Sequence, residues 1–176
     1  MNHEIVIPEE LTRRLRGHLF QNELEQAGFL FARVARDGSS LRFDVFDCYL
    51  VPASGWDVQM DVYLEMSHEE RGRILKLARE RDAAVIDCHS HPHSTDAVWF
   101  SPSDRSGITE FAQYVRWKLN GKPFAALVWG EDSVDGVVWQ DDFAQAQALG
   151  AVRSGGVRMT PTASWFKSYS RFNRFS

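Results

Sequence analysis

The sequence predicts an α/β protein of three layers, in which a mixed β-sheet is flanked by helices. Segments with helical apolar spacing alternate along the chain with short apolar or period-two segments, an order typical of this class. The 176 residues suffice for one well-buried core. With 44% hydrophobic and 25% charged residues, the composition argues against a disordered or fibrous chain.

The first part of the chain predicts a helix followed by a β-hairpin. Residues 8–20 begin with a proline and two glutamates and carry leucines at i, i+4 and i+8, which indicates an amphipathic helix. Residues 28–36 and 41–51 have strand-like composition, and the second segment alternates with a period of two. The Asp-Gly-Ser sequence at 37–39 predicts the turn between them.

The next elements continue the alternation. Residues 61–65 predict a short strand, and Ser67 with Glu70 forms a capping box that opens a helix to about Arg81. Four further elements are expected: a strand at 83–89, a helix at 102–119, and paired strands at 124–129 and 136–139.

The charge is unevenly distributed and divides the chain into residues 1–150 and 151–176. The net charge is −4, but residues 151–176 hold five basic and no acidic residues, which leaves −9 for the first 150. An acidic body argues against nucleic-acid binding. We interpret residues 151–176 as a basic, aromatic C-terminal tail that either docks on the acidic body or contacts a partner.

The sequence favours a cytoplasmic protein with no membrane association. No segment approaches the roughly 18 uninterrupted apolar residues of a membrane span, and the first residues lack the pattern of a secretory signal. Cys48 and Cys88 are the only cysteines, so a disulfide framework and a four-cysteine zinc site are excluded.

A pair of histidines at the end of a predicted strand indicates a metal site. His89 and His91 are separated by one serine and followed by Pro92, which ends the strand. Because strand residues alternate between faces, both histidines lie on one face, about 7 Å apart at Cα, and can bind the same zinc ion. Asp87 shares this face, whereas Cys88 lies on the other and is expected in the core.

A carboxylate after the histidines supplies the expected third ligand. Asp104 falls in the first turn of the helix at 102–119, from which it can turn back toward the strand end. Two histidines and one carboxylate leave a fourth position for water, as in catalytic zinc sites. Ser101 and Asp104 taken alone also fit an ordinary helix cap, and Asp96 is an alternative ligand in the loop.

The combined pattern resembles the JAMM zinc metalloproteases, also called MPN-plus or JAB-type. That family's signature is an upstream glutamate, His-x-His-Pro and Ser-x-x-Asp, which correspond here to Glu25, the His89–Pro92 segment and the Ser101–Asp104 segment. The glutamate lies in Glu-Gln-Ala-Gly-Phe-Leu, which is similar to the family's own context. One departure is the loop of nine residues before Ser101, where the family usually has seven.

The resemblance implies a JAB/MPN zinc metalloprotease domain with a cytidine-deaminase-like fold over residues 1–150. It implies Zn²⁺ held by His89, His91 and Asp104, and hydrolysis of an amide or isopeptide bond. Glu25 would take a proton from the attacking water and pass it to the leaving amine, with Glu23 as the nearby substitute. Ser101 would donate a hydrogen bond to the oxygen of the tetrahedral intermediate.

The resemblance also implies a substrate class. The chain looks most like bacterial members, which act on ubiquitin-like proteins and in some cases belong to antiviral defence systems. We expect deconjugation or precursor processing after the C-terminal tail of a ubiquitin-like protein, bound as an added strand with glycines near the cut. Two alternatives are a non-catalytic MPN-like scaffold subunit and an interaction protein that works through residues 151–176, with structural zinc.

Overall fold

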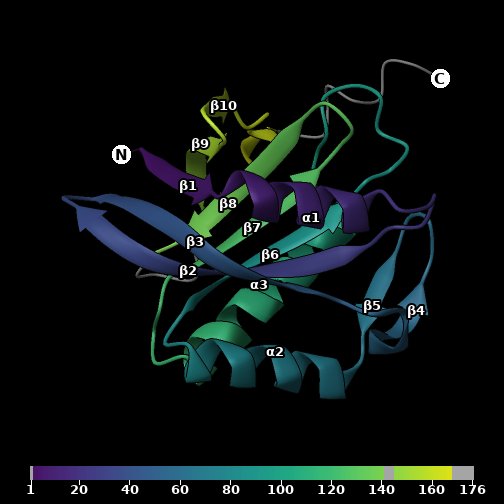
Figure 1. Ribbon diagram of the computed structural model, residues 1–176, viewed down its shortest axis with the longest axis horizontal. Coiled ribbons are helices and arrows are strands. Elements are labelled where there is room, and N and C mark those ends of the chain that lie inside the picture. Colours follow the sequence, from purple (N-terminus) through teal and green to yellow (C-terminus); the bar gives the residue numbers. More distant parts are fainter. Residues whose placement is uncertain (1, 141–144, 168–176) are drawn as a thin grey trace.

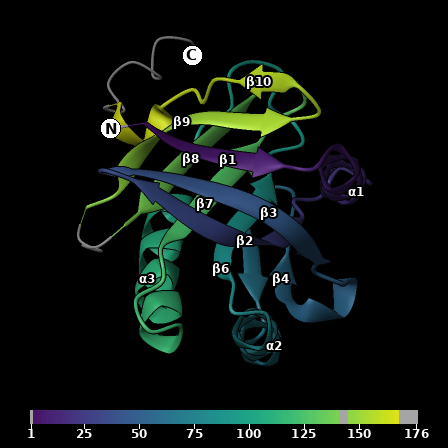
Figure 2. The ribbon, with the colours of Figure 1, turned by 60° about the vertical axis from the view of Figure 1, so that its left-hand side comes forward.

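Seven strands form a closed β-barrel in the part of the chain that the computed structural model describes, residues 2–140 and 145–167 (Figures 1 and 2). They are β1 (His3–Ile7), β2 (Ala27–Asp37), β3 (Ser40–Leu50), β6 (Ala84–Ser90), β7 (Phe124–Trp129), β8 (Val134–Trp139) and β9 (Gln147–Ser154). Their order is β1-β3-β2-β6-β7-β8-β9, and β9 pairs again with β1. The short β10 (Val157–Met159) adds to β9 outside this ring.

Strand β1 closes the barrel because it has a neighbour on each side. It runs parallel to β3, with Ile5 opposite Phe43, and parallel to β9, with Ile5 opposite Val152. The remaining neighbours are antiparallel except β6 and β7. Every barrel strand therefore has a partner on both edges, and the ring leaves no open edge.

The expected three-layer sheet with flanking helices, and with it the cytidine-deaminase-like JAB/MPN fold, is wrong. The described residues form a mostly-β protein around a closed barrel, with only three short α-helices. The sequence prediction placed no strand at residues 3–7 and assigned residues from 151 onward to a tail. Residues 3–7 and 147–154 are both barrel strands, and their mutual pairing joins the two edges of what would otherwise be an open sheet.

Two apolar clusters stabilise the fold, one inside the barrel and one outside it. The inner cluster takes residues from all seven barrel strands, and α1 (Glu9–Leu19) adds three leucines to it. The outer cluster packs α2 (His68–Glu80) and α3 (Pro102–Lys118) against the other face of the strands. Figure 2 shows these two helices together, on the side of β6 and β7 away from α1. Cys88 belongs to the inner cluster and is fully buried, which confirms its predicted core position.

The three α-helices and the long hairpin lie where the sequence predicts them. Strands β2 and β3 pair down to Asp37 and Ser40 at the turn, and the side chain of Ser67 caps α2 by accepting the N–H of Glu70. After α3, Gly121 has a φ of +76°, a left-handed conformation that glycine adopts without strain. None of the helices in the described ranges is both long and apolar enough to cross a bilayer.

A small second sheet and the C-terminal region complete the structure. Strand β4 (Trp56–Gln59) pairs with β5 (Leu64–Met66), close to the strand expected at 61–65. Residues 151–154 lie in β9, and two short 3₁₀ helices cover Ala53–Gly55 and Ser164–Phe166. The predicted C-terminal tail extends to residue 176, and its basic and aromatic residues after position 167 lie outside the described residues.

Candidate metal centre

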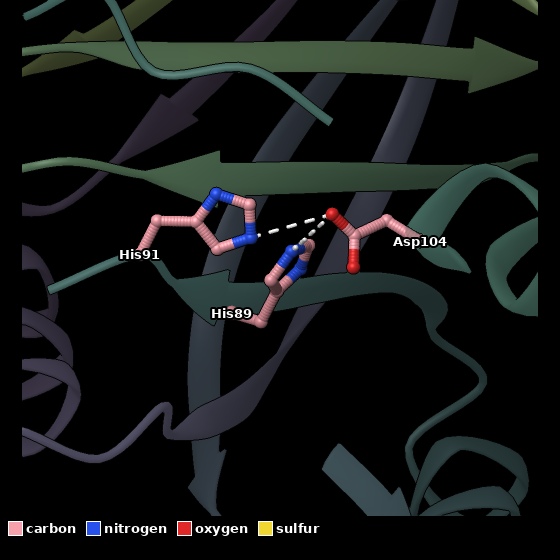
Figure 3. A group of neighbouring side chains, drawn as sticks. All are labelled: His89, His91 and Asp104. Carbon is pink, nitrogen blue, oxygen red and sulfur yellow. Dashed lines mark ion pairs between the residues drawn. The ribbon is translucent and has the colours of Figure 1, made fainter. Parts of the chain in front are cut away.

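Strand β6 and helix α3 bring His89, His91 and Asp104 to one point (Figure 3). His89 lies at the end of β6 on its outer face. His91 is held one residue beyond this strand because its N–H donates to the carbonyl of Trp129, which continues the ladder with β7. Asp104 extends from the first turn of α3, and Figure 3 shows its carboxylate directed toward both imidazoles.

The spacing of the three side chains fits a tetrahedral metal site. Nε2 of His89 lies 3.5 Å and Nε2 of His91 lies 3.3 Å from the same Oδ2 of Asp104. Two ligands bound at ~2.0–2.1 Å and at the tetrahedral angle are about 3.3–3.4 Å apart. All three ligand atoms lie within 4.8 Å of one another, so the group could hold a metal ion.

His89 supports a metal site through an unsatisfied nitrogen. Its Nε2 is buried and has no hydrogen-bond partner within the described residues, and Oδ2 of Asp104 lies 3.5 Å away. Such a buried polar nitrogen is costly unless something binds it. A divalent cation at this position would bind the imidazole and satisfy the nitrogen.

The helix cap aims Asp104 at the histidines. The backbone N–H of Ser101 donates to Oδ2 of Asp104 at 2.7 Å, and the backbone N–H of Asp104 donates to Oγ of Ser101 at 3.1 Å. Asp104 therefore both caps α3 and directs its carboxylate at the histidines, two roles that the sequence pattern allows together. The Oγ of Ser101 acts here as an acceptor, which leaves its own proton for another partner; its role in catalysis stays a prediction.

The electrostatics of the group favour a positive charge at its centre. Burial lowers the pKa of His89, but the charges of Asp104, Asp87 and Glu25 outweigh burial and raise this pKa to about 9. Burial by itself would raise the pKa of Asp104, but the two histidines hold this pKa well below its usual range. A proton provides this positive charge in the metal-free protein, and a divalent cation could take its place.

Glu25 lies beside the group, as a general base would. Its Oε1 is 3.4 Å from Nε2 of His91, and the residue is only 6% exposed. Its backbone N–H donates to Met60 and its carbonyl accepts from Gln59, which fix it to the chain before β5. Burial raises the pKa of Glu25 to about 7, assisted by Asp104 and Asp61 and opposed by His89.

Asp96 and Glu23, the alternatives to Asp104 and Glu25 that the sequence offers, are not part of the metal centre formed by the described residues. Asp96 is exposed and is not part of the metal-ligating group found within the described ranges; its backbone carbonyl accepts from Ser133. Glu23 is also exposed, and the structure shows no contact of its carboxylate with the histidines among the described residues. Glu25 is the glutamate that reaches His91.

A C-terminal segment supports the loop between the ligands. Oγ of Ser164 accepts the N–H of Phe100 at 3.0 Å and donates to the fully buried Asp135. The ring of Trp165 packs edge-on against Phe100 at 5.1 Å, and Phe100 in turn packs against His89 at 5.9 Å. The loop that is longer than expected is therefore held at its far end, close to the metal ligands.

A cleft of about 770 Å³ extends from the metal centre, between α3 on one side and α2 with the residues before and within β5 on the other. Glu25, His89 and Asp104 line one part of it, and Arg71 and Asp87 line another. Burial raises the pKa of Asp87 to about 6. The sequence placed Asp87 on the histidine face but gave it no role, and nothing in the local pattern around Arg71 indicates its position at the cleft.

Comparisons with known proteins do not assign the chain to a family. No protein-family model matches it. Over 129 residues it is 33% identical to the alanine–tRNA ligase of Parvibaculum lavamentivorans, a match that covers 70% of this chain. The chain spans only 13% of that ligase, so the similarity concerns a small part of a much longer enzyme.

Proposed function

We propose that this chain is a zinc-dependent peptidase or isopeptidase of the JAMM type. The observation that carries the proposal is the convergence of Asp104 and Glu25 on Nε2 of His91, beside the buried and unsatisfied Nε2 of His89. Two imidazoles and one carboxylate are the ligand set of a zinc site that keeps an open position. The second carboxylate has a pKa near neutrality, as a general base requires.

The residues divide the chemistry of amide hydrolysis between them. When bound, zinc supplies a Lewis acid that polarises the carbonyl and makes water a stronger acid. Glu25 accepts the proton that water loses as its oxygen attacks the carbonyl carbon, and delivers it to the nitrogen as the C–N bond breaks. Ser101 has a hydroxyl proton available for the oxygen that becomes negative, a type of contact commonly worth about 10²–10³ in rate.

The surface around the cleft supports a protein substrate. Four large apolar side chains are exposed on the segments next to Glu25: Leu24, Met60, Val62 and Tyr63. Exposed apolar side chains beside a site are typical of contacts with another macromolecule. We propose the flexible, glycine-ended tail of a ubiquitin-like protein, which would add a strand to β5 inside the cleft. The free thiols of Cys48 and Cys88 fit action in a reducing compartment such as the bacterial cytoplasm.

The proposal is tested by metal content and turnover in matched variants. After extensive dialysis the wild type should retain about one zinc ion, and it should cleave a ubiquitin-like fusion with a Gly-Gly tail. Glu25→Ala should keep the metal and lose turnover by about 10²-fold or more, whereas the exposed Glu23→Ala should match the wild type. A non-catalytic scaffold would show no cleavage in any variant. A structural zinc site would retain the metal without turnover.

A further inference from the structure

The floor of the cleft carries a carboxylate, Asp87, that forms no hydrogen bond or ion pair within the described residues, although its charge acts on nearby His89. Asp87 lies on β6 between Phe29 of β2 and Ala126 of β7, on the outer face of these strands. The apolar side chains of Phe29 and Phe111 line the same cleft. No side chain of the described ranges donates a hydrogen bond to Asp87 or forms an ion pair with it. A carboxylate on such a floor is stable only when water or a ligand binds it.

Arg71 is the arginine that lines the same cleft as Asp87. It lies on α2, and its Nε is buried with no hydrogen-bond partner among the described residues. Within the described part of the chain, no ion pair joins it to Asp87. The cleft therefore offers an acceptor and a donor separately, which suits a ligand with a cationic group and a carbonyl oxygen, as a peptide has.

The charge of the cleft favours a cation over an anion. Its acidic side chains outnumber its arginine: Glu25, Glu65, Asp87, Asp104 and Glu110 line it together with Arg71 and two histidines. Glu25 and Asp104 belong to the metal centre, and Glu65 and Glu110 are exposed at the rim. Asp87 is the half-buried acid of the cleft that lies outside the metal centre.

The geometry points to a lysine or arginine of the substrate as the partner of Asp87. On this inference, which rests on the proposed function, Asp87 selects a cationic side chain at the third residue of the substrate tail, counted back from the scissile carbonyl. Asp87 precedes His89 by two residues, about 7 Å along the strand, and an extended substrate advances by the same ~3.3 Å per residue. The aliphatic stem would pack on the rings of Phe29 and Phe111.

The experiment compares fusions that differ only at this third residue, which is Arg, Gln or Glu before two glycines. The wild type should cleave the Arg substrate with a kcat/KM about 10–100-fold above that of the Glu substrate. Asp87→Asn should reduce this ratio at least tenfold, and because the ratio compares two substrates of one variant, a change in metal content affects both rates and cancels. The rim variant Glu110→Gln serves as the matched control and should leave the ratio unchanged.

A binding measurement separates this inference from the proposed function. The three tails, as peptides, are titrated onto the zinc-loaded Glu25→Gln protein, which cannot turn them over on the proposed mechanism. Preferential binding of the Arg peptide without hydrolysis by the wild type would sink the proposed function and support the role of Asp87. Hydrolysis by the wild type with equal kcat/KM for the Arg and Glu substrates would overturn the role of Asp87, even if Asp87→Asn fails to fold. Absence of both binding and hydrolysis would overturn both proposals.

Discussion

Replacing Glu25 by glutamine should make the metal-free protein more stable, because the ionised carboxylate is unfavourable where it lies. Burial raises its pKa from 4.5 to about 7. At pH 8 the carboxyl is ionised in both the folded and the unfolded chain, and a shift of this size then corresponds to roughly 3 kcal/mol of lost stability. The isosteric amide carries no charge, so the variant should recover up to that amount.

The sign of the effect depends on pH in a defined way. Below pH 4.5 the carboxyl is protonated in both states, and its contribution to the free energy of unfolding is fully retained. This contribution is lost as the pH rises toward about 7, because the folded state holds the proton more tightly. The stability gain of Glu25→Gln should therefore be less than about 1 kcal/mol at pH 5 and near its maximum at pH 8.

Urea denaturation of both proteins at pH 5 and pH 8, after chelation of metal, measures the gain. Glu23→Gln provides the control, since that side chain is exposed and its replacement should change stability by less than about 0.5 kcal/mol. A Glu25→Gln protein no more stable than the wild type at pH 8, or one with the same gain at both pH values, would refute the argument. It would mean that Glu25 is solvated and that its proximity to His91 does not reflect a buried general base.

Three further predictions concern the metal ligands and their support. Metal affinity should rise about tenfold per pH unit below pH 9, because binding must displace the proton of His89, and titration calorimetry at several pH values would show a flat profile if it does not. Asp104→Asn should weaken zinc binding by at least 10–100-fold, whereas Asp96→Asn should bind as the wild type does; the opposite result would make Asp96 the ligand. Asp135→Asn should lower the free energy of unfolding by about 2–4 kcal/mol, because the buried carboxylate accepts hydrogen bonds from backbone N–H groups and from the hydroxyl of Ser164; an unchanged urea midpoint would contradict this.

The candidate site could be predicted from the sequence because its determinants are local. Strand alternation places His89 outside and Cys88 inside the barrel, and the cap of a helix places Asp104 within reach of both histidines. These relations depend on segments of a few residues each, for which backbone geometry is nearly fixed. Glu25 required the family resemblance, since its approach to His91 depends on the pairing of β2 with β6.

The barrel could not be predicted in the same way. Its closure depends on the pairing of residues 3–7 with residues 149–154, and apolar periodicity indicates strands but not their partners. The cleft has the same origin, because Arg71 and Asp87 line one cleft only after α2 packs against the strands. Their relation is tertiary, and no spacing along the chain expresses it.

The two-sided pairing of β1 has a consequence for how the protein is synthesised. The ribosome makes His3–Ile7 well before Gln147–Ser154, the segment that completes its hydrogen bonding. Pairing between such distant segments is slow, and unpaired strand edges recruit other chains in the meantime. The nascent polypeptide therefore carries two unpaired sheet edges until Gln147–Ser154 has left the exit tunnel. Slower translation at low temperature, or a chaperone that covers the unpaired strand edges, should raise the yield of native protein.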